Sequence, residues 1–245
     1  MSTLVQYGLA RGVARVALDS PHNRNALSGA LMSELEQRLA DATADPGVRI
    51  VELTHTGSTF CAGADLTEAR HGVDTLRVIA LLRQIVDLPK PVVGSIDGHV
   101  RAGGMGILGA CDIVLAGPAS TFAFSEVRLG LAPAMISLTT LPRLTARAAG
   151  RYYLTGEIFD APTAAQIGLV TQAVDDIDLA TNALLDALRK ASPQGLRETK
   201  PLTTHDLTFD NADALAEQSA RLFASDEARE GMTSFLEKRP PRWVL

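Results

Sequence analysis

The stretch DGHVRAGGMGILGACDIVLAGPASTFAFSE, residues 97–126, decides how this chain folds. An apolar strand pattern at residues 91–96 leads into it, a turn with four glycines follows, and an apolar helical run begins at Ile107. The N–H groups in the first turn of a helix have no intrahelical acceptor, and glycine lets a ligand oxygen approach them closely. The stretch therefore predicts a turn that suits a negative or developing negative charge.

A second stretch repeats this plan upstream. Residues 48–54 have a strand pattern, residues 57–66 read GSTFCAGADL as a turn, and a helical pattern follows. Two such turns, from neighbouring parallel strands, would aim two N–H groups at one oxygen. Neither turn is a triphosphate loop, because no Lys-Ser or Lys-Thr closes it. The alternative is that the glycines only allow a helix to pack closely on a strand.

Composition bounds the class of protein. The 245 residues suffice for one large domain or two small ones, and 46% of them are hydrophobic, which is ample for a buried core. The net charge of −5 includes no dense basic block, so nucleic acid is not an expected partner. No apolar stretch approaches the roughly 20 residues of a membrane span, and residues 1–10 lack a secretory signal pattern. We expect a soluble, cytoplasmic protein without a membrane partner.

The two cysteines, Cys61 and Cys111, lie far apart in apolar, glycine-containing contexts. They form no zinc pattern with histidines, so no metal site is expected, and a cytosolic chain would keep both thiols reduced. Both are interpreted as small core residues.

The remaining chain alternates strand and helix patterns. Residues 5–18 predict a hairpin, and Ser28 is the expected N-cap of a helix whose leucines recur every four residues from Leu27 to Leu39. Further helices are expected within residues 66–88, 137–144, 146–154 and 161–167, a strand at 169–174, and mostly helix over 178–239. Pro142 should divide the second and third of these helices. The pattern predicts an α/β core at residues 1–190 and a helical C-terminal subdomain at 191–245.

Several of these segments together resemble the enoyl-CoA hydratase/isomerase (crotonase) superfamily. The similar motifs are FCAGADL at 60–66, KPV at 90–92, DG at 97–98, GG at 103–104, CDI at 111–113, SEV at 125–127, LGL at 129–131 and the final helix from 224 to 238. The similarity covers nearly the whole chain. It implies a crotonase-like (ClpP/crotonase) α/β spiral of ββα units with a helical C-terminal trimerisation region, in a homotrimer or a hexamer made of two trimers.

The resemblance also assigns residues. It implies that the N–H groups of Ala64 and Gly103 bind the thioester oxygen and that Glu126 transfers the proton. The residues implied for coenzyme A binding are Ala62, Ala64, Asp65, Leu66, Thr67, Arg24, Phe235 and Lys238, the last two reaching a neighbouring subunit's coenzyme A. Those implied for the acyl pocket are Gly104, Met105, Gly106, Pro133 and Met135.

One position departs from the two-glutamate pattern of the family. Gly106 stands where the first catalytic glutamate of those hydratases lies, so the mechanism must depend on Glu126 or on another acid, such as Asp97 or Glu68. Hydratases of the methylglutaconyl-CoA type can also carry glycine there, and residues 125–137 resemble that branch. Arg101 is interpreted either as a partner for a second substrate carboxylate or as a solvated loop arginine.

The leading hypothesis is hydration of a 2-enoyl-CoA to a 3-hydroxyacyl-CoA, with coenzyme A as part of the substrate and no separate cofactor. The first alternative is an isomerase that moves a 3-enoyl double bond into conjugation, which needs only one glutamate. The second alternative is an acyl-CoA-binding protein without catalysis, against which the presence of Glu126 argues.

Overall fold

The computed structural model describes residues 3–70, 72, 74–204 and 207–244, and its centre is a six-stranded sheet in the order β1-β2-β3-β5-β7-β10. Its strands are β1 (Val5–Ala10), β2 (Val13–Leu18), β3 (Ile50–His55), β5 (Val92–Ile96), β7 (Ile113–Ala116) and β10 (Gln172–Ala173). Only β1 runs antiparallel to its neighbour. The predicted hairpin is confirmed: β1 and β2 are joined by Arg11 and Gly12, which both have positive φ, as a two-residue type I′ turn requires.

A second, smaller sheet has the order β4-β6-β8-β9. Its strands are β4 (Thr59–Cys61), β6 (His99–Arg101), β8 (Thr121–Ala123) and β9 (Phe159–Asp160). Each repeat of the chain adds one strand to the large sheet and then one to the small sheet: β3 leads to β4, β5 to β6, and β7 to β8. Within both sheets the added strands are parallel neighbours. This repetition is a spiral of ββα units, so the predicted fold class is confirmed.

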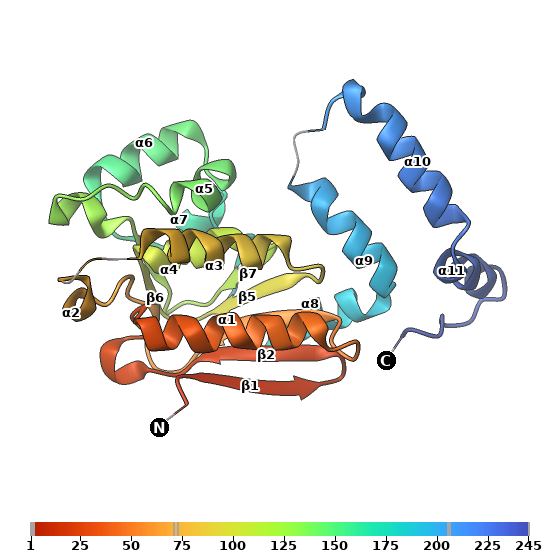
Figure 1. Ribbon diagram of the computed structural model, residues 1–245, viewed down its shortest axis with the longest axis horizontal. Coiled ribbons are helices and arrows are strands. Elements are labelled where there is room, and N and C mark those ends of the chain that lie inside the picture. The colour runs from red at the N-terminus through yellow and green to blue at the C-terminus, as the bar shows by residue number, and fades with distance from the viewer. Residues whose placement is uncertain (1–2, 71, 73, 205–206, 245) are drawn as a thin grey trace.

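Helices cover both faces of the large sheet (Figure 1). The α-helices are α1 (Gly29–Ala44), α2 (Leu66–Ala69), α3 (Thr75–Asp87), α4 (Gly103–Ala110), α5 (Ser137–Thr140), α6 (Ala146–Thr155), α7 (Ala161–Gln166), α8 (Ile177–Lys190), α9 (Pro193–Thr199), α10 (Ala212–Phe223) and α11 (Asp226–Leu236). The 3₁₀ helices are η1 (Pro21–Asn23), η2 (Ser125–Leu129), η3 (Leu141–Arg143), η4 (Lys200–Thr203) and η5 (Phe209–Asn211). The main core lies beneath α1, α3 and α4, whereas Leu185 of α8 packs on Val13, Ile50 and Val93 in a second cluster.

The sequence patterns were correct for most elements and wrong in four places. Pro142 lies in η3 and divides α5 from α6 as predicted, and Ser28 caps α1 by accepting from the N–H of Leu31. The helix expected over residues 66–88 is two helices, α2 and α3, and the strand expected over 169–174 is only the two residues of β10. The stretches interpreted wholly as turns each contain a three-residue strand, β4 or β6, which is too short to show an alternating pattern.

Helices α9 to α11 project from one end of the core (Figure 1), and a buried ion pair joins them to it. The Nζ of Lys200 lies 3.0 Å from Oδ2 of Asp112 and also donates to the carbonyls of Ile85 and Lys90. Burial raises the pKa of Asp112, and Lys200 opposes that rise. Within the described residues, no helix is long and apolar enough to cross a membrane.

Replacing Lys200 with Met should lower the free energy of unfolding by about 3 kcal/mol, because it leaves the Asp112 carboxylate buried without its cation. The folded-state pKa of Asp112 is already raised and should rise further in the variant, so the deficit should shrink as pH falls through that pKa. Urea denaturation of wild type and variant at pH 5 and pH 8 measures this. Lys190→Met, at an exposed lysine of α8, is the control, and an equal loss in both variants would contradict the prediction.

Candidate active site

Three segments predicted to carry chemistry leave the same edge of the small sheet. In the parallel strands β4, β6 and β8, Cys61 pairs with Val100, and Arg101 pairs with Ala123. The carboxyl ends of parallel strands meet at one edge of a sheet. The turn at residues 63–64, the start of α4 at Gly103 and the segment reaching Glu126 therefore lie together.

The two glycine turns touch each other. Gly63 has a φ of 94°, and a Cβ added to it would lie 2.7 Å from the Cβ of Ala102, so a side chain there is excluded both by conformation and by space. A Cβ on Gly103 would lie 2.8 Å from Cδ1 of Leu27 and 3.9 Å from the backbone N of Ala64. The backbone nitrogens of Ala64 and Gly103 are thus neighbours across the contact between the turns.

Both nitrogens are available to a ligand. Gly103 is the first residue of the eight-residue helix α4, so its N–H has no intrahelical acceptor. Among the described residues, the Ala64 N–H donates to no protein acceptor, although the N–H groups of Gly63 and Asp65 on either side of it do. Two neighbouring N–H donors without acceptors, one of them at a helix N-terminus, suit an oxygen that gains negative charge during a reaction.

The residue of the second turn that contacts the first turn is strained. Ala102, the N-cap of α4, has φ 46° and ψ −117°, a conformation rare for a residue with a side chain. Such a conformation costs about 1–3 kcal/mol and persists only where the surroundings enforce it. Here its Cβ packs on Gly63, so the strain and the contact between the turns occur at the same point.

Glu126 lies in the first turn of η2 with its side chain partly buried. Burial raises the pKa of its carboxyl, and its Oε2 is buried without a hydrogen-bond partner among the described residues. A carboxyl group with a raised pKa and a free oxygen suits proton transfer. The other two acids considered have partners elsewhere: Asp97 accepts from the N–H of Ala119, and Glu68 accepts from the N–H of Gly29.

The space beside the Cα of Gly106 is filled by other side chains. A Cβ there would lie 2.6 Å from Cγ2 of Ile136 and 3.3 Å from Cδ1 of Leu82. Helix α5 approaches α4 so closely that Thr139 donates to the Gly106 carbonyl at 2.8 Å, and a Cβ on Gly109 would lie 2.7 Å from the Thr139 carbonyl oxygen. Apolar side chains thus occupy the space that a carboxylate at this position would need.

A G-x-G-x-x-G spacing occurs at residues 104–109, but it lies inside α4 and does not form a dinucleotide-binding turn. Gly104 contacts Cys61, and the other two glycines of the motif contact α5, so close packing explains all three. Cys61 and Cys111 are buried, and burial raises the pKa of each thiol to about 12, which makes both poor nucleophiles.

Helix α2 begins beside the Ala64 turn. Asp65 caps it, and hydrogen bonds from the hydroxyl and the N–H of Thr67 lower the pKa of that carboxyl. Arg24 is exposed, and its carbonyl accepts from the N–H of Ala62 at 3.1 Å, while Leu66 is 60% exposed. The residues that the resemblance assigns to coenzyme A around this turn therefore form one surface.

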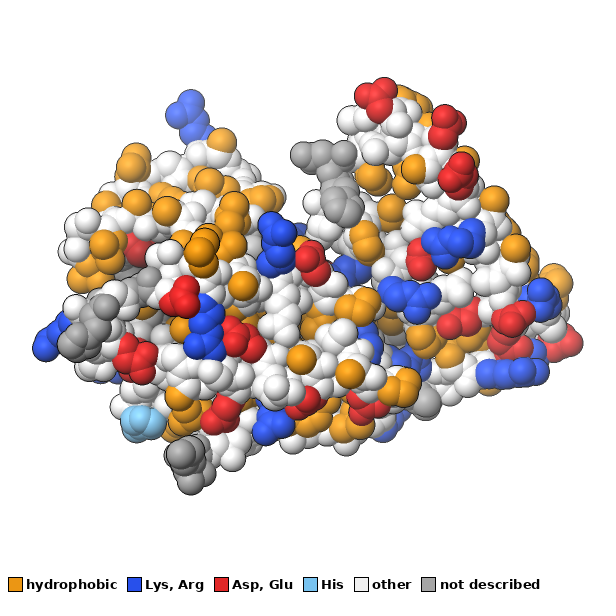
Figure 2. Space-filling view, in the orientation of Figure 1, with side chains coloured by type: hydrophobic (Ala, Val, Ile, Leu, Met, Phe, Trp, Pro, Cys, Tyr) orange, Lys and Arg blue, Asp and Glu red, His pale blue; other side chains and the backbone are white. Residues whose placement is uncertain are grey.

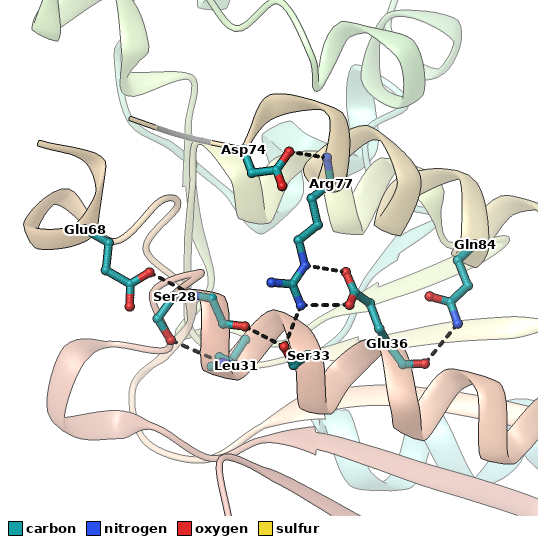
Figure 3. A network of polar contacts seen from close by, with 9 residues as sticks. Ser28, Leu31, Ser33, Glu36, Glu68, Asp74, Arg77 and Gln84 are labelled. Atoms are coloured by element: carbon teal, nitrogen blue, oxygen red, sulfur yellow. Dashed lines mark hydrogen bonds and ion pairs between the residues drawn. The ribbon is translucent and has the colours of Figure 1, made fainter. Parts of the chain in front are cut away.

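Polar contacts hold α2 and α3 against α1 (Figure 3). Glu68 of α2 accepts from the first N–H of α1, at Gly29, where the α1 sequence lacks its own capping acid. Arg77 of α3 forms two hydrogen bonds to Glu36 and a third to Ser33. Both helices that follow the Ala64 turn, α2 and α3, are therefore held against α1.

The other assigned residues divide into two groups. Met105 and Pro133 are buried, and Met135 packs partly buried against the core, all near α4 or α5. Phe235 and Lys238 are exposed at the end of α11, far from α2 and α4 in Figure 1. Within one chain the structure does not bring those two residues to the site.

Arg101 lies in a strand and not in a loop. It lies half-buried in β6, and its guanidinium donates to the carbonyl and hydroxyl oxygens of Thr121 at 2.6 and 2.8 Å. These contacts direct it toward the amino end of β8, away from Gly103. The expectation of a solvated loop arginine is wrong, and the contacts do not favour pairing with a substrate carboxylate at this turn.

The sequence did not predict the contacts that Asn25, Leu27 and Ile136 make around the two glycine turns. Leu27 lies against Gly103, and its backbone pairs with the residues on both sides of Ala64. No spacing rule relates residues 25–27 to residues 63–103. The available signal was an asparagine four residues before the start of α1, which is a common local pattern.

Comparison with known proteins identifies the family to which this fold belongs. The model of the Enoyl-CoA hydratase/isomerase family matches residues 8–244. An enoyl-CoA hydratase structure from Mycobacterium avium is 56% identical, covers 99% of this chain and 100% of its own, and superimposes with a TM-score of 0.79. An enoyl-CoA hydratase from Shewanella pealeana (32% identical, covering 98% and 96%, TM-score 0.92) and Pseudomonas aeruginosa AtuE (29%, covering 99% and 100%, TM-score 0.93) have similar structures. The chain belongs to the enoyl-CoA hydratase/isomerase family.

Gly106→Ala should lower the free energy of unfolding by about 1–3 kcal/mol, because its Cβ must displace Ile136. The loss should be smaller when the same change is made in an Ile136→Ala background, which a double-mutant cycle from urea denaturation would measure. Additive effects would show that Ile136 does not restrict this position.

Gly106→Glu should reduce turnover rather than add a working carboxylate.

Proposed function

We propose that this protein is an enoyl-CoA hydratase that adds water across the 2,3 double bond of a 2-enoyl-CoA with one catalytic carboxylate. The observation that carries the proposal is the buried, unpartnered Oε2 of Glu126 at the sheet edge that also carries the neighbouring N–H groups of Ala64 and Gly103. The relatives named as enoyl-CoA hydratases support the same reaction class.

In this mechanism the thioester oxygen accepts hydrogen bonds from Ala64 and Gly103 while the enolate forms, which stabilises the transition state. Ionised Glu126 takes a proton from water as the oxygen bonds to carbon 3. The carboxyl then gives a proton to carbon 2, which regenerates the carboxylate. The raised pKa of Glu126 makes it a better proton acceptor than an exposed glutamate.

A second candidate is isomerisation of a 3-enoyl-CoA to its 2-enoyl isomer. The observation that favours it is the apolar filling at Gly106, where Ile136 and Leu82 leave no room for a second carboxylate to hold water. Isomerisation needs no water, because Glu126 would carry one proton from carbon 2 to carbon 4. The oxyanion-binding N–H groups would serve both reactions.

Glu126→Gln should lower turnover of crotonyl-CoA by ~100- to 10,000-fold and leave acyl-CoA affinity nearly unchanged, because the shape and the N–H donors remain. In wild type, activity should fall as pH drops through the raised pKa of Glu126, since the carboxylate base is then protonated. Loss of the conjugated enone absorbance reports hydration, and deuterium entering a 3-enoyl-CoA without hydration reports isomerisation. Turnover of the variant equal to wild type would falsify the assignment of Glu126.

The exposed apolar residues of α10 and α11 support a trimer or a hexamer. Phe223, Phe235 and Leu236 are 70%, 83% and 78% exposed, and Leu202, Leu215 and Leu222 line a groove beside α10. A further group of exposed apolar residues lies over and around α5 and α6, where Figure 2 shows hydrophobic side chains gathered: Leu129, Leu138, Leu141 and Leu154. Exposed apolar surface on this scale is typical of subunit contacts.

Light scattering at micromolar concentration should give the mass of three or six chains. Replacing Phe235 and Leu236 together with Glu should shift the protein toward monomer, because it places charge on the apolar end of α11. Leu179→Glu, at a leucine of α8 that is 70% exposed, is the control. A monomeric wild type would rule out the proposed assembly.

A further inference from the structure

Asn25 occupies an unusual place in the loop before α1. Its side chain is fully buried, and its φ of 52° follows a φ of 60° at Arg24, so two consecutive residues with side chains adopt the left-handed conformation. Asparagine tolerates this region better than most residues, but the conformation still needs support from its surroundings.

The amide of Asn25 supplies that support by joining the loop to the strand that leads into the site. Its Oδ1 accepts from the N–H of Ser20 at 2.6 Å. Its Nδ2 donates to the carbonyl of Thr59 at 2.7 Å and to that of Thr56 at 3.2 Å, at the start of β4 and just before it. One buried amide thus holds the loop onto β4, which continues directly into the Gly63–Ala64 turn.

Leu27, two residues further on, transmits this position to the N–H donors. Its N–H donates to the Gly63 carbonyl at 2.8 Å, and its carbonyl accepts from the N–H of Asp65 at 3.4 Å. These two bonds lie on either side of Ala64 and leave the Ala64 N–H free. The side chain of Leu27 lies against Gly103, so Leu27 contacts both turns.

We propose that Asn25 is a positioning residue for the reaction, which acts through Leu27 to set the direction of the Ala64 N–H relative to the Gly103 N–H. The proposal rests on the proposed function, in which these two groups bind the thioester oxygen. Glycine at position 25 would satisfy the left-handed backbone but not the three hydrogen bonds. Position 25 therefore requires a residue that both adopts the left-handed backbone conformation and carries a side-chain amide.

Asn25→Gly should lower kcat by ~10- to 100-fold while KM changes less than about threefold, because a misplaced donor weakens transition-state binding more than coenzyme A binding. Asn25→Asp keeps the acceptor for Ser20 but turns a carboxylate oxygen toward two carbonyls. It should lower both stability and kcat. Steady-state kinetics with crotonyl-CoA measure kcat and KM, and each kcat is divided by the fraction of enzyme that is folded at the assay temperature.

The control is Thr181→Val, which removes a buried hydroxyl pair between α8 and β5, where Oγ1 of Thr181 lies 2.8 Å from Oγ of Ser95. This variant should lose stability with kcat unchanged. An Asn25→Gly enzyme with the kcat of this control would show that Asn25 has only a structural role.

A second readout does not require turnover. Butyryl-CoA labelled with ¹³C at the thioester carbonyl binds without reacting, and its infrared stretching frequency reports polarisation by the N–H donors. The downshift on binding should be smaller in Asn25→Gly than in wild type or Thr181→Val, and an equal downshift in all three overturns the proposal. Absence of crotonyl-CoA turnover by wild type contradicts the proposed function alone, because the carbonyl shift still tests Asn25.

Discussion

The contact between the Gly63 turn and the Ala102–Gly103 turn is the constraint on which the rest of the site depends. It brings two backbone nitrogens together only because Gly63 and Gly103 have no side chains where Ala102 and Leu27 approach them. It also enforces the strained φ of 46° at Ala102. A backbone site of this kind tolerates little change at its neighbours, because every residue that contacts the turns also sets the direction of an N–H group.

The spiral of ββα units explains how such a contact arises. Each unit leaves the small sheet at the same edge, so successive turns of the chain place the Ala64 turn, the α4 N-terminus and the segment of Glu126 beside one another. The large sheet supplies the buried core beneath α1, α3 and α4. The site is therefore built from consecutive repeats of one local pattern, although its residues span more than sixty positions.

The sequence predicted the elements whose signals are local. The hairpin, the Ser28 cap and the division at Pro142 follow from turn chemistry, capping and proline geometry. Strands β4 and β6 were missed because three residues show no periodicity. The filling of Gly106 by Ile136 and the capping of α1 by Glu68 depend on residues about thirty to forty positions apart, and no local pattern encodes such contacts.

The same long-range packing bears on the chemistry at Glu126. In the sequence, the glycine at position 106 shows only that the carboxylate is absent, whereas the structure shows that Ile136 and Leu82 occupy the volume its side chain would need. Thr139 fixes α5 there by donating to the Gly106 carbonyl, so the filling belongs to the helix packing and not to one movable side chain. A water molecule in this site would lack a carboxylate partner at position 106. Glu126 must therefore orient the water and also carry out both proton transfers. Its raised pKa and its unpartnered Oε2 suit these two tasks.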